Sequence, residues 1–333
     1  MIGASAGGVE ALQAIVAALP HDYPGAIFVV LHVPSDAPSL LASILDRLGG
    51  LRAQRAVEGP FRKGHIYVAP PDQHLVLERG RMRVAHGPRE NRHRPAIDVL
   101  FRSAAMAYGP RVTGVVLTGT LDDGSAGLWS VKNRGGVAVV QDPRDAMFPD
   151  MPRNAMDAVT VDYCLPLREI APALVRIANE PLLSVATQPD VKMELEVNMA
   201  SQTTATMDQL DRLGARSELT CPECGGALWE MQQPPPRFRC HVGHAYSLRT
   251  LIAAQGDRVE SALWAGLRGI EESEALAQRL RDSARERGHE HSVRLYEERL
   301  VEHKRNAETL REILRVLPGE AVSDEPPSAQ GTG

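Results

Sequence analysis

Three side chains with the chemistry of a serine hydrolase follow three separate β-rich runs of the sequence. Ser5 lies in GASAGG, which fits the G-x-S-x-G pattern of a nucleophile elbow. His32 follows the run AIFVVL, and Asp123 lies in TGTLDDG after the run VTGVVL. In such enzymes an imidazole removes the serine proton and a carboxylate orients the imidazole. The sequence therefore predicts a triad of Ser5, His32 and Asp123.

Each of these residues also has an ordinary structural explanation. A glycine turn between a strand and a helix packs the two together or cradles a phosphate, a histidine at a strand end is more often structural, and aspartates before Gly commonly cap helices. The conjunction of hydroxyl, imidazole and carboxylate at three strand ends favours the triad. A nucleotide-binding oxidoreductase is disfavoured because the second strand ends in LHVP, without an acidic residue. The order Ser, His, Asp also differs from that of the α/β-hydrolases.

Short apolar runs alternate with helical stretches over the first half of the chain, and this alternation is typical of a doubly wound α/β fold. The runs are apolar on both faces, as expected for a mostly parallel sheet covered by helices. The predicted strands are 26–31, 66–69, 112–117, 137–141 and 159–163, and the predicted helices are 9–19, 39–48, 96–108, 125–133 and 167–178. Parallel strands would bring the three triad loops to one edge.

Six runs carry a resemblance to a known family. IGASAGGVEAL, LHVP, HIYVAPPDQHL, NRHRPAIDVLF, GVVLTGTLDDGSAGL and DMPRNAM occur in the order found in CheB-type protein-glutamate methylesterases. The resemblance implies that Ser5 is the nucleophile, His32 the base and Asp123 the residue that orients it. It also assigns backbone N–H groups at Ala6 and Thr120 to the oxyanion hole. Arg94 is assigned to the same pocket.

By this resemblance the chain demethylates glutamate γ-methyl esters on chemoreceptor-type signalling proteins, deamidates glutamines by the same chemistry, and needs no cofactor for catalysis. The chemotaxis members read TGMGNDG where this chain has TGTLDDG, so Leu121 replaces a glycine and Asp122 an asparagine. Those members also carry a receiver domain before the catalytic domain, which is not expected here. The alternative is a non-catalytic signalling adaptor on the same fold that acts through its C-terminal part.

Three of the four cysteines form a metal-binding pattern. Cys221 and Cys224 form a CxxC knuckle, and Cys240 and His244 follow in CHVGH. Two thiolates on a tight turn followed by Cys and His are typical of a zinc ribbon with four filled ligand positions, which makes the metal structural. His241 is the reserve fourth ligand. A metal-free knuckle or a redox dithiol is the alternative, and Cys164 alone is expected in the core.

The remaining composition divides the chain further. We expect a catalytic domain at 1–180, a partly disordered linker at 181–218, a zinc-ribbon-like unit at 219–247, a helical hairpin at 248–317 and a disordered tail at 318–333. The hairpin carries apolar residues at helical spacing and is a candidate for self-association or for binding a partner helix.

Charge and hydropathy exclude several classes of function. The net charge of −5 gives no basic field for nucleic acid. No run approaches the length of a membrane span, and no secretory signal opens the sequence. We therefore expect a cytoplasmic protein whose partner is a methylated chemoreceptor or a similar signalling protein, without nucleic acid and without membrane insertion.

Overall fold

The computed structural model describes residues 1–317, except 37, 39, 182–189, 202–204 and 233. The chain divides into two compact units, Met1–Leu251 and Ile252–Gly333. The first unit contains the catalytic domain and the cysteine cluster together. The tail predicted at 318–333 lies outside the described residues.

A seven-stranded sheet forms the centre of the first unit. Its strands are β1 (Ile2–Ala4), β2 (Ile27–Leu31), β3 (Arg52–Arg55), β5 (His65–Val68), β8 (Thr113–Val116), β9 (Val137–Gln141) and β10 (Tyr163–Leu165). The order is β10-β9-β8-β1-β2-β5-β3, and every neighbouring pair is parallel. This confirms the predicted α/β class. The chain reverses its direction of winding beside β1, the kind of position where α/β folds place their sites.

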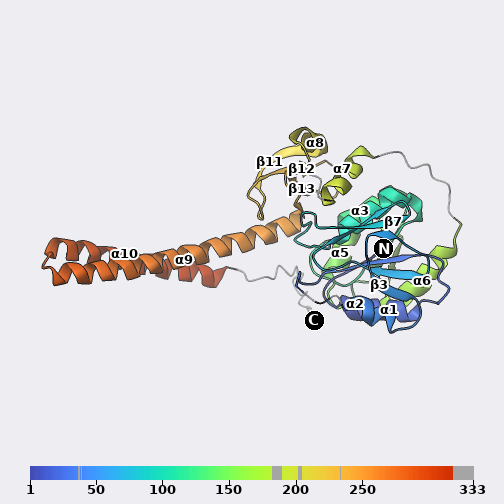
Figure 1. Cartoon of the computed structure of the whole chain (residues 1–333), viewed down its shortest axis with the longest axis horizontal. Coiled ribbons are helices and arrows are strands. Elements are labelled where there is room, and N and C mark those ends of the chain that lie inside the picture. The colour runs from blue at the N-terminus through green and yellow to red at the C-terminus, as the bar shows by residue number, and fades with distance from the viewer. Residues whose placement is uncertain (37, 39, 182–189, 202–204, 233, 318–333) are drawn as a thin grey trace, which may run out of the picture. The chain divides into compact units, whose positions relative to one another are not determined.

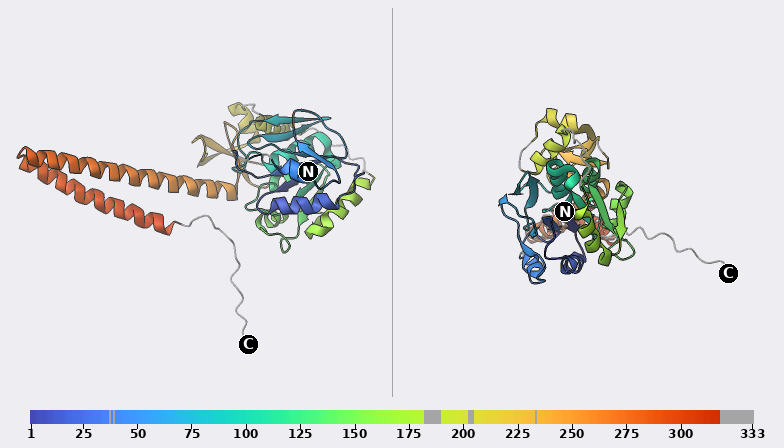
Figure 2. Two further views of the ribbon diagram at one scale, coloured as in Figure 1. Left: turned by 60° about the horizontal axis from the view of Figure 1, so that its bottom comes forward. Right: turned by 90° about the vertical axis from the view of Figure 1, so that its right-hand side faces the viewer.

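Helices cover both faces of this sheet (Figures 1 and 2). One face carries α1 (Gly8–Ala18), α2 (Leu41–Asp46) and α6 (Leu167–Asn179), and the other carries α3 (Ile97–Tyr108), α4 (Ser125–Asn133) and α5 (Asp150–Ala158), with η1 (Gly109–Arg111) after α3. Leu12 and Ile15 belong to the first apolar layer, and Phe101 and Leu128 belong to the second. Burial of both sheet faces explains why the strand sequences are apolar without alternation.

A small antiparallel sheet lies beside α3. It consists of β4 (Gly59–Pro60), β6 (His74–Glu78) and β7 (Arg81–Ala85), in the order β4-β7-β6. Gly80 turns the β6–β7 hairpin with φ of 78°, a conformation that favours glycine.

The range 181–218, expected as a linker, is structured in its described part. It contains α7 (Val191–Ala200), α8 (Met207–Leu213) and β11 (Gly214–Thr220). Asp190 caps α7, and Thr206 forms a reciprocal capping box with Gln209 at α8. The polar composition did not predict α7 and α8 because each helix buries only a few apolar residues, among them Val197 and Leu210.

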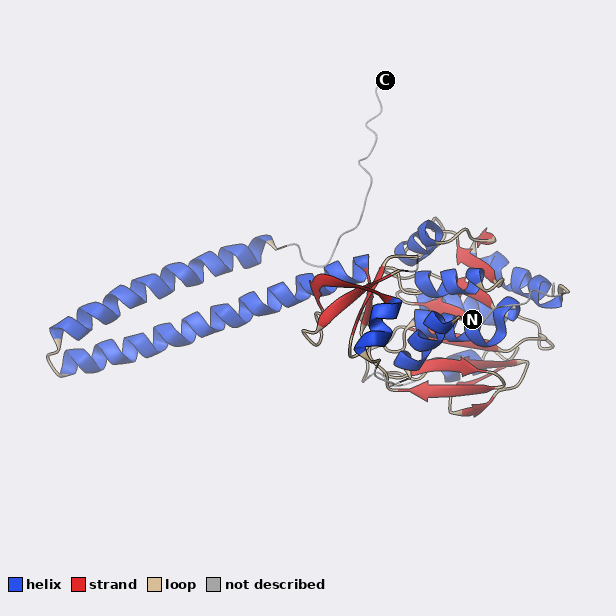
Figure 3. Ribbon diagram, turned by 90° about the horizontal axis from the view of Figure 1, so that it is seen from above, coloured by secondary structure: helices blue, strands red, loops and turns tan. Residues whose placement is uncertain are grey.

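The cysteine cluster belongs to a four-stranded antiparallel sheet in the order β11-β12-β13-β14. Figure 3 distinguishes strands from helices by colour. The last three strands are β12 (Ala227–Met231), β13 (Arg237–Cys240) and β14 (Ala245–Ser247). We call residues 214–247 the cysteine module. Trp229 on β12 is buried against Leu210 and Leu213 of α8.

Two helices make up the described part of the second unit. Most of α9 (Leu248–Glu286) and all of α10 (Glu290–Val316) belong to it, and the turn between them contains Gly288 with φ of 71°. Ion pairs such as Arg311–Glu271 join the two helices. None of the described helices combines the length and the apolar composition needed to cross a membrane.

Candidate active site and metal centre

The three predicted triad residues follow the adjacent strands β1, β2 and β8. The backbone N–H of His32 donates to the carbonyl of Ala4 at 3.2 Å, and the N–H of Ser5 donates to the carbonyl of Thr118 at 3.0 Å. These bonds continue the parallel ladders past the strand ends. The loops that carry Ser5, His32 and Asp123 therefore share one edge of the sheet.

The turn at Ser5 is tight because glycines line it. Gly7, the N-cap residue of α1, has φ of 71°. A Cβ at Gly119, on the loop after β8, would stand 2.7 Å from Cβ of Ser5, closer than side chains tolerate. The Ser5 loop and the loop after β8 can therefore pack closely because Gly119 has no side chain.

The imidazole of His32 is hydrogen-bonded to the carboxylate of Asp123. Nε2 lies 2.8 Å from Oδ2, and the side chains are only 6% and 1% exposed. Nδ1 of His32 is buried and makes no hydrogen bond to any described residue. The structure thus brings His32 and Asp123 together, and Ser5 comes from the neighbouring strand without a hydrogen bond to Nδ1.

Four donors surround the carboxylate of Asp123. Oδ1 accepts from Nδ2 of Asn91 at 2.9 Å and from the N–H of Asp98 at 3.3 Å. Oδ2 accepts from the N–H of Ile97 at 2.6 Å in addition to His32. Burial alone would raise the pKa of Asp123, but the hydrogen bond and charge of His32, with further donors, outweigh it and lower the pKa to about 2. Asp123 is therefore an ionised acceptor.

Asp98 is a second buried acid at the site. Its Oδ1 accepts from the N–H groups of Gly124 at 3.0 Å and Gly127 at 2.6 Å, and its Oδ2 accepts from Asn91 at 2.8 Å. Burial, reinforced by the charge of Asp123, raises the pKa of Asp98 to about 7. Sequence reasoning missed both Asp98 and Asn91. Their only signal was their position in the run NRHRPAIDVLF.

A second imidazole stacks on the ring of His32. The rings of His93 and His32 lie 3.5 Å apart at 10°. Burial, and next the charge of His32, lower the pKa of His93 to about 3. His93 is therefore neutral at physiological pH and holds one face of the His32 ring.

The predicted oxyanion and pocket residues Ala6, Thr120 and Arg94 differ in exposure and in their hydrogen-bond partners. Thr120 is exposed, and the carbonyl of Ala6 accepts from the Thr118 hydroxyl at 3.0 Å. The Arg94 guanidinium donates to Asp72 at 2.7 and 2.9 Å and to the carbonyl of Gly87 at 2.8 Å. These donors of Arg94 are thus occupied by structural partners.

Leu121 has φ of 61°, in the left-handed region that favours glycine. The family glycine expected at this position has a conformational reason, and leucine is strained there by roughly 1–2 kcal/mol. The amide of Asn154 donates to the Leu121 carbonyl at 2.7 Å and helps to hold this turn.

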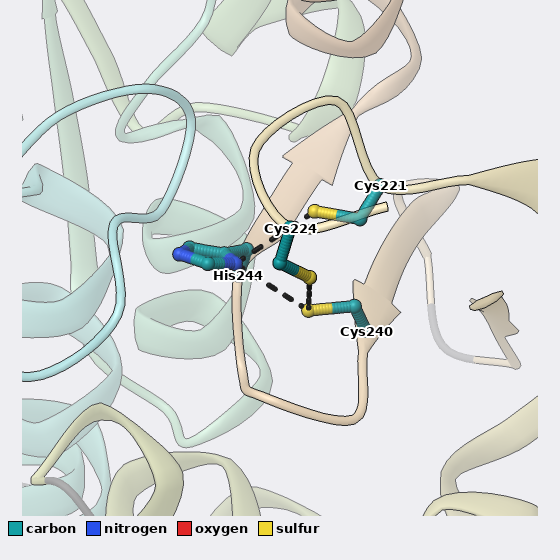
Figure 4. A group of neighbouring side chains, drawn as sticks. All are labelled: Cys221, Cys224, Cys240 and His244. Carbon is teal, nitrogen blue, oxygen red and sulfur yellow. Dashed lines mark hydrogen bonds between the residues drawn. The ribbon is translucent and has the colours of Figure 1, made fainter. Parts of the chain in front are cut away.

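The four predicted metal ligands converge in the cysteine module (Figure 4). One ligand atom each from Cys221, Cys224, Cys240 and His244 lie within 4.8 Å of one another. Sγ of Cys224 and Sγ of Cys240 are 3.7 Å apart, and Nδ1 of His244 is 3.7 and 3.5 Å from the sulfurs of Cys221 and Cys240. Tetrahedral zinc, with Zn–S of about 2.3 Å and Zn–N of about 2.0 Å, requires edges of about 3.8 and about 3.5 Å. The donor set fits such an ion.

The surroundings of the cluster support metal binding. Nε2 of His244 lies 3.2 Å from Oε2 of Glu223, the carboxylate contact that orients a metal-bound histidine. His241, the reserve ligand, is not part of the group. Cys164, expected in the core, is exposed because it lies on the edge strand β10.

Comparison with known proteins identifies the catalytic domain. The model of the CheB methylesterase family matches residues 1–174. The chain belongs to the CheB methylesterase family. It therefore contains the catalytic domain of a carboxylic ester hydrolase. A protein-glutamate methylesterase/protein-glutamine glutaminase of Leptospira interrogans, named as putative, is 40% identical over 184 residues, 55% of this chain and 95% of that protein.

A longer CheB relative and a solved structure agree. A protein-glutamate methylesterase/protein-glutamine glutaminase of Anaeromyxobacter dehalogenans is 41% identical over 184 residues, 54% of this chain and 51% of that protein. The crystal structure of the Thermotoga maritima CheB methylesterase catalytic domain is 32% identical, with a TM-score of 0.50, and covers 53% of this chain and 96% of that domain. These matches extend over about half of the chain, and the family model ends before the cysteine module and the hairpin.

Proposed function

We propose that this chain is a protein-glutamate methylesterase that acts on methylated chemoreceptor-type proteins in the cytoplasm, with Ser5, His32 and Asp123 as its triad. The observation that carries the proposal is the buried hydrogen bond between His32 and Asp123, beside the loop of Ser5. The names of the relatives support the substrate class, including deamidation of glutamine side chains.

The geometry suggests how the reaction proceeds. With Nε2 of His32 donating to Asp123, Nδ1 is the ring atom free to take the proton of the Ser5 hydroxyl. Ser5 then attacks the ester carbonyl, and backbone N–H groups at Ala6 and Thr120 hold the oxyanion. Methanol leaves with the proton from the imidazole. Water, activated by the same Nδ1, hydrolyses the acyl-enzyme and restores Ser5.

A fluorophosphonate probe and methylated receptor fragments test the proposal together. We expect one Ser5 adduct per chain and methanol release from the fragments, both abolished by Ser5→Ala. Ser125→Ala is a matched control, because that serine begins α4 and makes no side-chain hydrogen bond within the described residues. Turnover that survives in Ser5→Ala would exclude the triad. A wild-type chain that neither reacts nor turns over would favour the adaptor.

We also propose that the cysteine module binds one structural zinc ion through Cys221, Cys224, Cys240 and His244. The edge lengths of the ligand group support this, and a fully protein-ligated ion leaves no open position for substrate. Elemental analysis should give one zinc per chain, and Cys224→Ser should lower it strongly while Cys164→Ser leaves it unchanged. Equal zinc in both variants would refute the assignment.

Self-association through α9 and α10 is a separate part of the proposal. Val259, Trp264 and Leu276 expose apolar side chains on α9, with Trp264 53% exposed. Sedimentation velocity of the full chain should show a dimer that Trp264→Glu weakens. A monomer at all concentrations would remove this part and leave the esterase proposal intact.

A further inference from the structure

The last strand of the cysteine module pairs with the segment that leads to α3. The N–H of Ala245 donates to the carbonyl of Arg89 at 3.2 Å, and the N–H of Asn91 donates to the carbonyl of Ala245 at 2.7 Å. β14 thus adds its backbone to residues 89–91, two positions before the stacked His93. This contact joins parts of the chain that lie more than 150 residues apart.

The side chain of Asn91 connects this strand to the triad. Its Oδ1 accepts from the N–H of Ser247 at 3.0 Å and from the Thr250 hydroxyl at 3.2 Å. Its Nδ2 donates to Asp123 at 2.9 Å and to Asp98 at 2.8 Å. A flipped amide would direct Nδ2 at two donors and Oδ1 at two carboxyl groups. Ser247 and Thr250 therefore fix the orientation that Asp123 needs.

A second contact reaches the neighbour of the triad acid. The Ser247 hydroxyl donates to Oδ1 of Asp122 at 2.7 Å. Ser247 therefore touches both sides of the carboxylate loop, through Asn91 and through Asp122. The asparagine expected at position 122 from the family pattern offers an oxygen of the same shape, so this contact does not depend on the charge.

Buried charges lock the module in place. Glu90 forms two hydrogen bonds with Arg102 of α3, at 2.7 and 2.8 Å, and one with Arg239 of β13 at 2.9 Å. Glu196 of α7 pairs with Arg237 at 2.8 Å and with Arg102 at 3.3 Å. All five side chains are at most 6% exposed. Partial separation of the module from α3 and α7 would leave buried charges without partners. The docking of the module is therefore close to all-or-none.

Two of the proposed metal ligands, Cys240 and His244, lie in the turn directly before β14, the strand that makes these contacts. The N–H of Cys240 donates to the carbonyl of His244 at 3.0 Å, and β14 begins at the next residue. Gly243 in this turn has φ of 112°, and a Cβ there would stand 2.9 Å from Pro88. An ion bound by Cys240 and His244 would therefore fix the turn that sets the position of β14.

We propose that the metal-bound cysteine module, together with the first turn of α9 that directly follows it, is a positioning element of the esterase, which holds the Asp123 carboxylate toward His32 through Asn91. The inference rests on the proposed triad. The module makes no contact with the reacting atoms in this scheme. It acts by fixing the orientation of one amide, so its loss lowers the rate of the chemical step more than substrate binding.

The test uses the full chain and a matched pair of variants at one position. Thr250→Val removes the hydroxyl that donates to Asn91, whereas Thr250→Ser keeps it. We expect Thr250→Val to lower kcat for methanol release about fivefold, the usual effect of one lost hydrogen bond, with KM within about twofold. Thr250→Ser should recover most of kcat. Zinc content should be unchanged in both variants.

Metal removal is the second arm. A zinc chelator, or Cys224→Ser, should lower kcat about tenfold or more and slow fluorophosphonate labelling of Ser5, without lowering its final stoichiometry. Added Zn²⁺ should restore the chelated wild-type chain, and Cys164→Ser should behave as wild type. Unchanged kcat in Thr250→Val and in the metal-free chain would overturn the inference, as would equal losses in the Val and Ser variants. Failure of the unmodified chain to label at Ser5 would overturn the triad proposal itself.

Discussion

Asp122 is an acid whose ionisation the fold opposes, so its replacement by asparagine should stabilise the protein at neutral pH. It stands beside the ionised Asp123, and Ser247 donates to its Oδ1 at 2.7 Å. Burial, with the charge of Asp123 adding to it, raises the pKa of Asp122 to about 6. An amide side chain at this position would keep an oxygen for the Ser247 hydroxyl and would remove the charge.

The expected gain depends on pH in a direction fixed by this shift. The pKa of Asp122 rises from 3.8 to about 6 on folding, about two units, which corresponds to about 3 kcal/mol at 1.36 kcal/mol per unit. Because the folded pKa is the higher one, the folded chain binds the proton more tightly, and this contribution to stability is lost as pH rises from 4 through 6. Asp122 keeps partial exposure, so we take about 2 kcal/mol as the gain for Asp122→Asn at pH 8.

Urea unfolding followed by tryptophan fluorescence measures this gain at pH 4.5 and pH 8. The wild-type chain, Asp122→Asn and the control Asp157→Asn are compared, since Asp157 is an exposed acid on α5. We expect the gain of Asp122→Asn at pH 8 to exceed that at pH 4.5 by about 1 kcal/mol or more. Asp157→Asn should change little at either pH. A gain that is equal at both pH values, or a loss at pH 8, would refute the electrostatic reasoning.

Three further substitutions test other contacts of the site. Gly119→Ala places a Cβ 2.7 Å from that of Ser5. Fluorophosphonate labelling should therefore fall sharply while the circular dichroism spectrum is retained. Normal labelling would show that the loops can move apart. Glu196→Gln leaves the buried Arg237 without its carboxylate partner and Arg102 and Arg239 with Glu90 alone. The free energy of unfolding in urea should fall by about 3–5 kcal/mol; a loss below about 1 kcal/mol would contradict a tightly paired interface. His93→Phe keeps a ring stacked on His32 and removes a group with a pKa of about 3. The acid limb of the pH profile of kcat/KM, measured above pH 5, should therefore not move. A displaced limb would mean that His93 titrates in that range.

The meeting of the loops that carry Ser5, His32 and Asp123 was predictable because sheet geometry dictates it. Parallel strands end at a common edge, so polar residues after apolar runs meet there even when they are far apart in sequence. His32 and Asp123 lie 91 positions apart and still form a hydrogen bond. The convergence of the four candidate metal ligands was predictable for a related reason, since a knuckle and a short hairpin bring their cysteines together locally.

The residues that contact His32 and Asp123 were not predictable in the same way. Asn91 and His93 lie in an irregular segment before α3, and no periodicity indicates where their side chains point. Their contacts depend on the register of β14 against residues 89–91, which a single sequence does not encode in any local pattern. The helices α7 and α8 were missed because their apolar faces are narrow and their neighbours are polar.

The buried charge cluster bears on how this domain combination arose and is inherited. Without α7 and β13, Glu90 and Arg102 would still pair with each other. A fused segment that brought only Arg237 and Arg239 would bury two positive charges beside that pair, whereas one that also brought Glu196 buries a net charge of one. We therefore expect substitutions at these five charged positions to occur in compensating pairs. Exchange of this C-terminal segment between homologous genes should succeed only when the segment carries Glu196 with its arginines and the recipient domain carries Glu90 and Arg102.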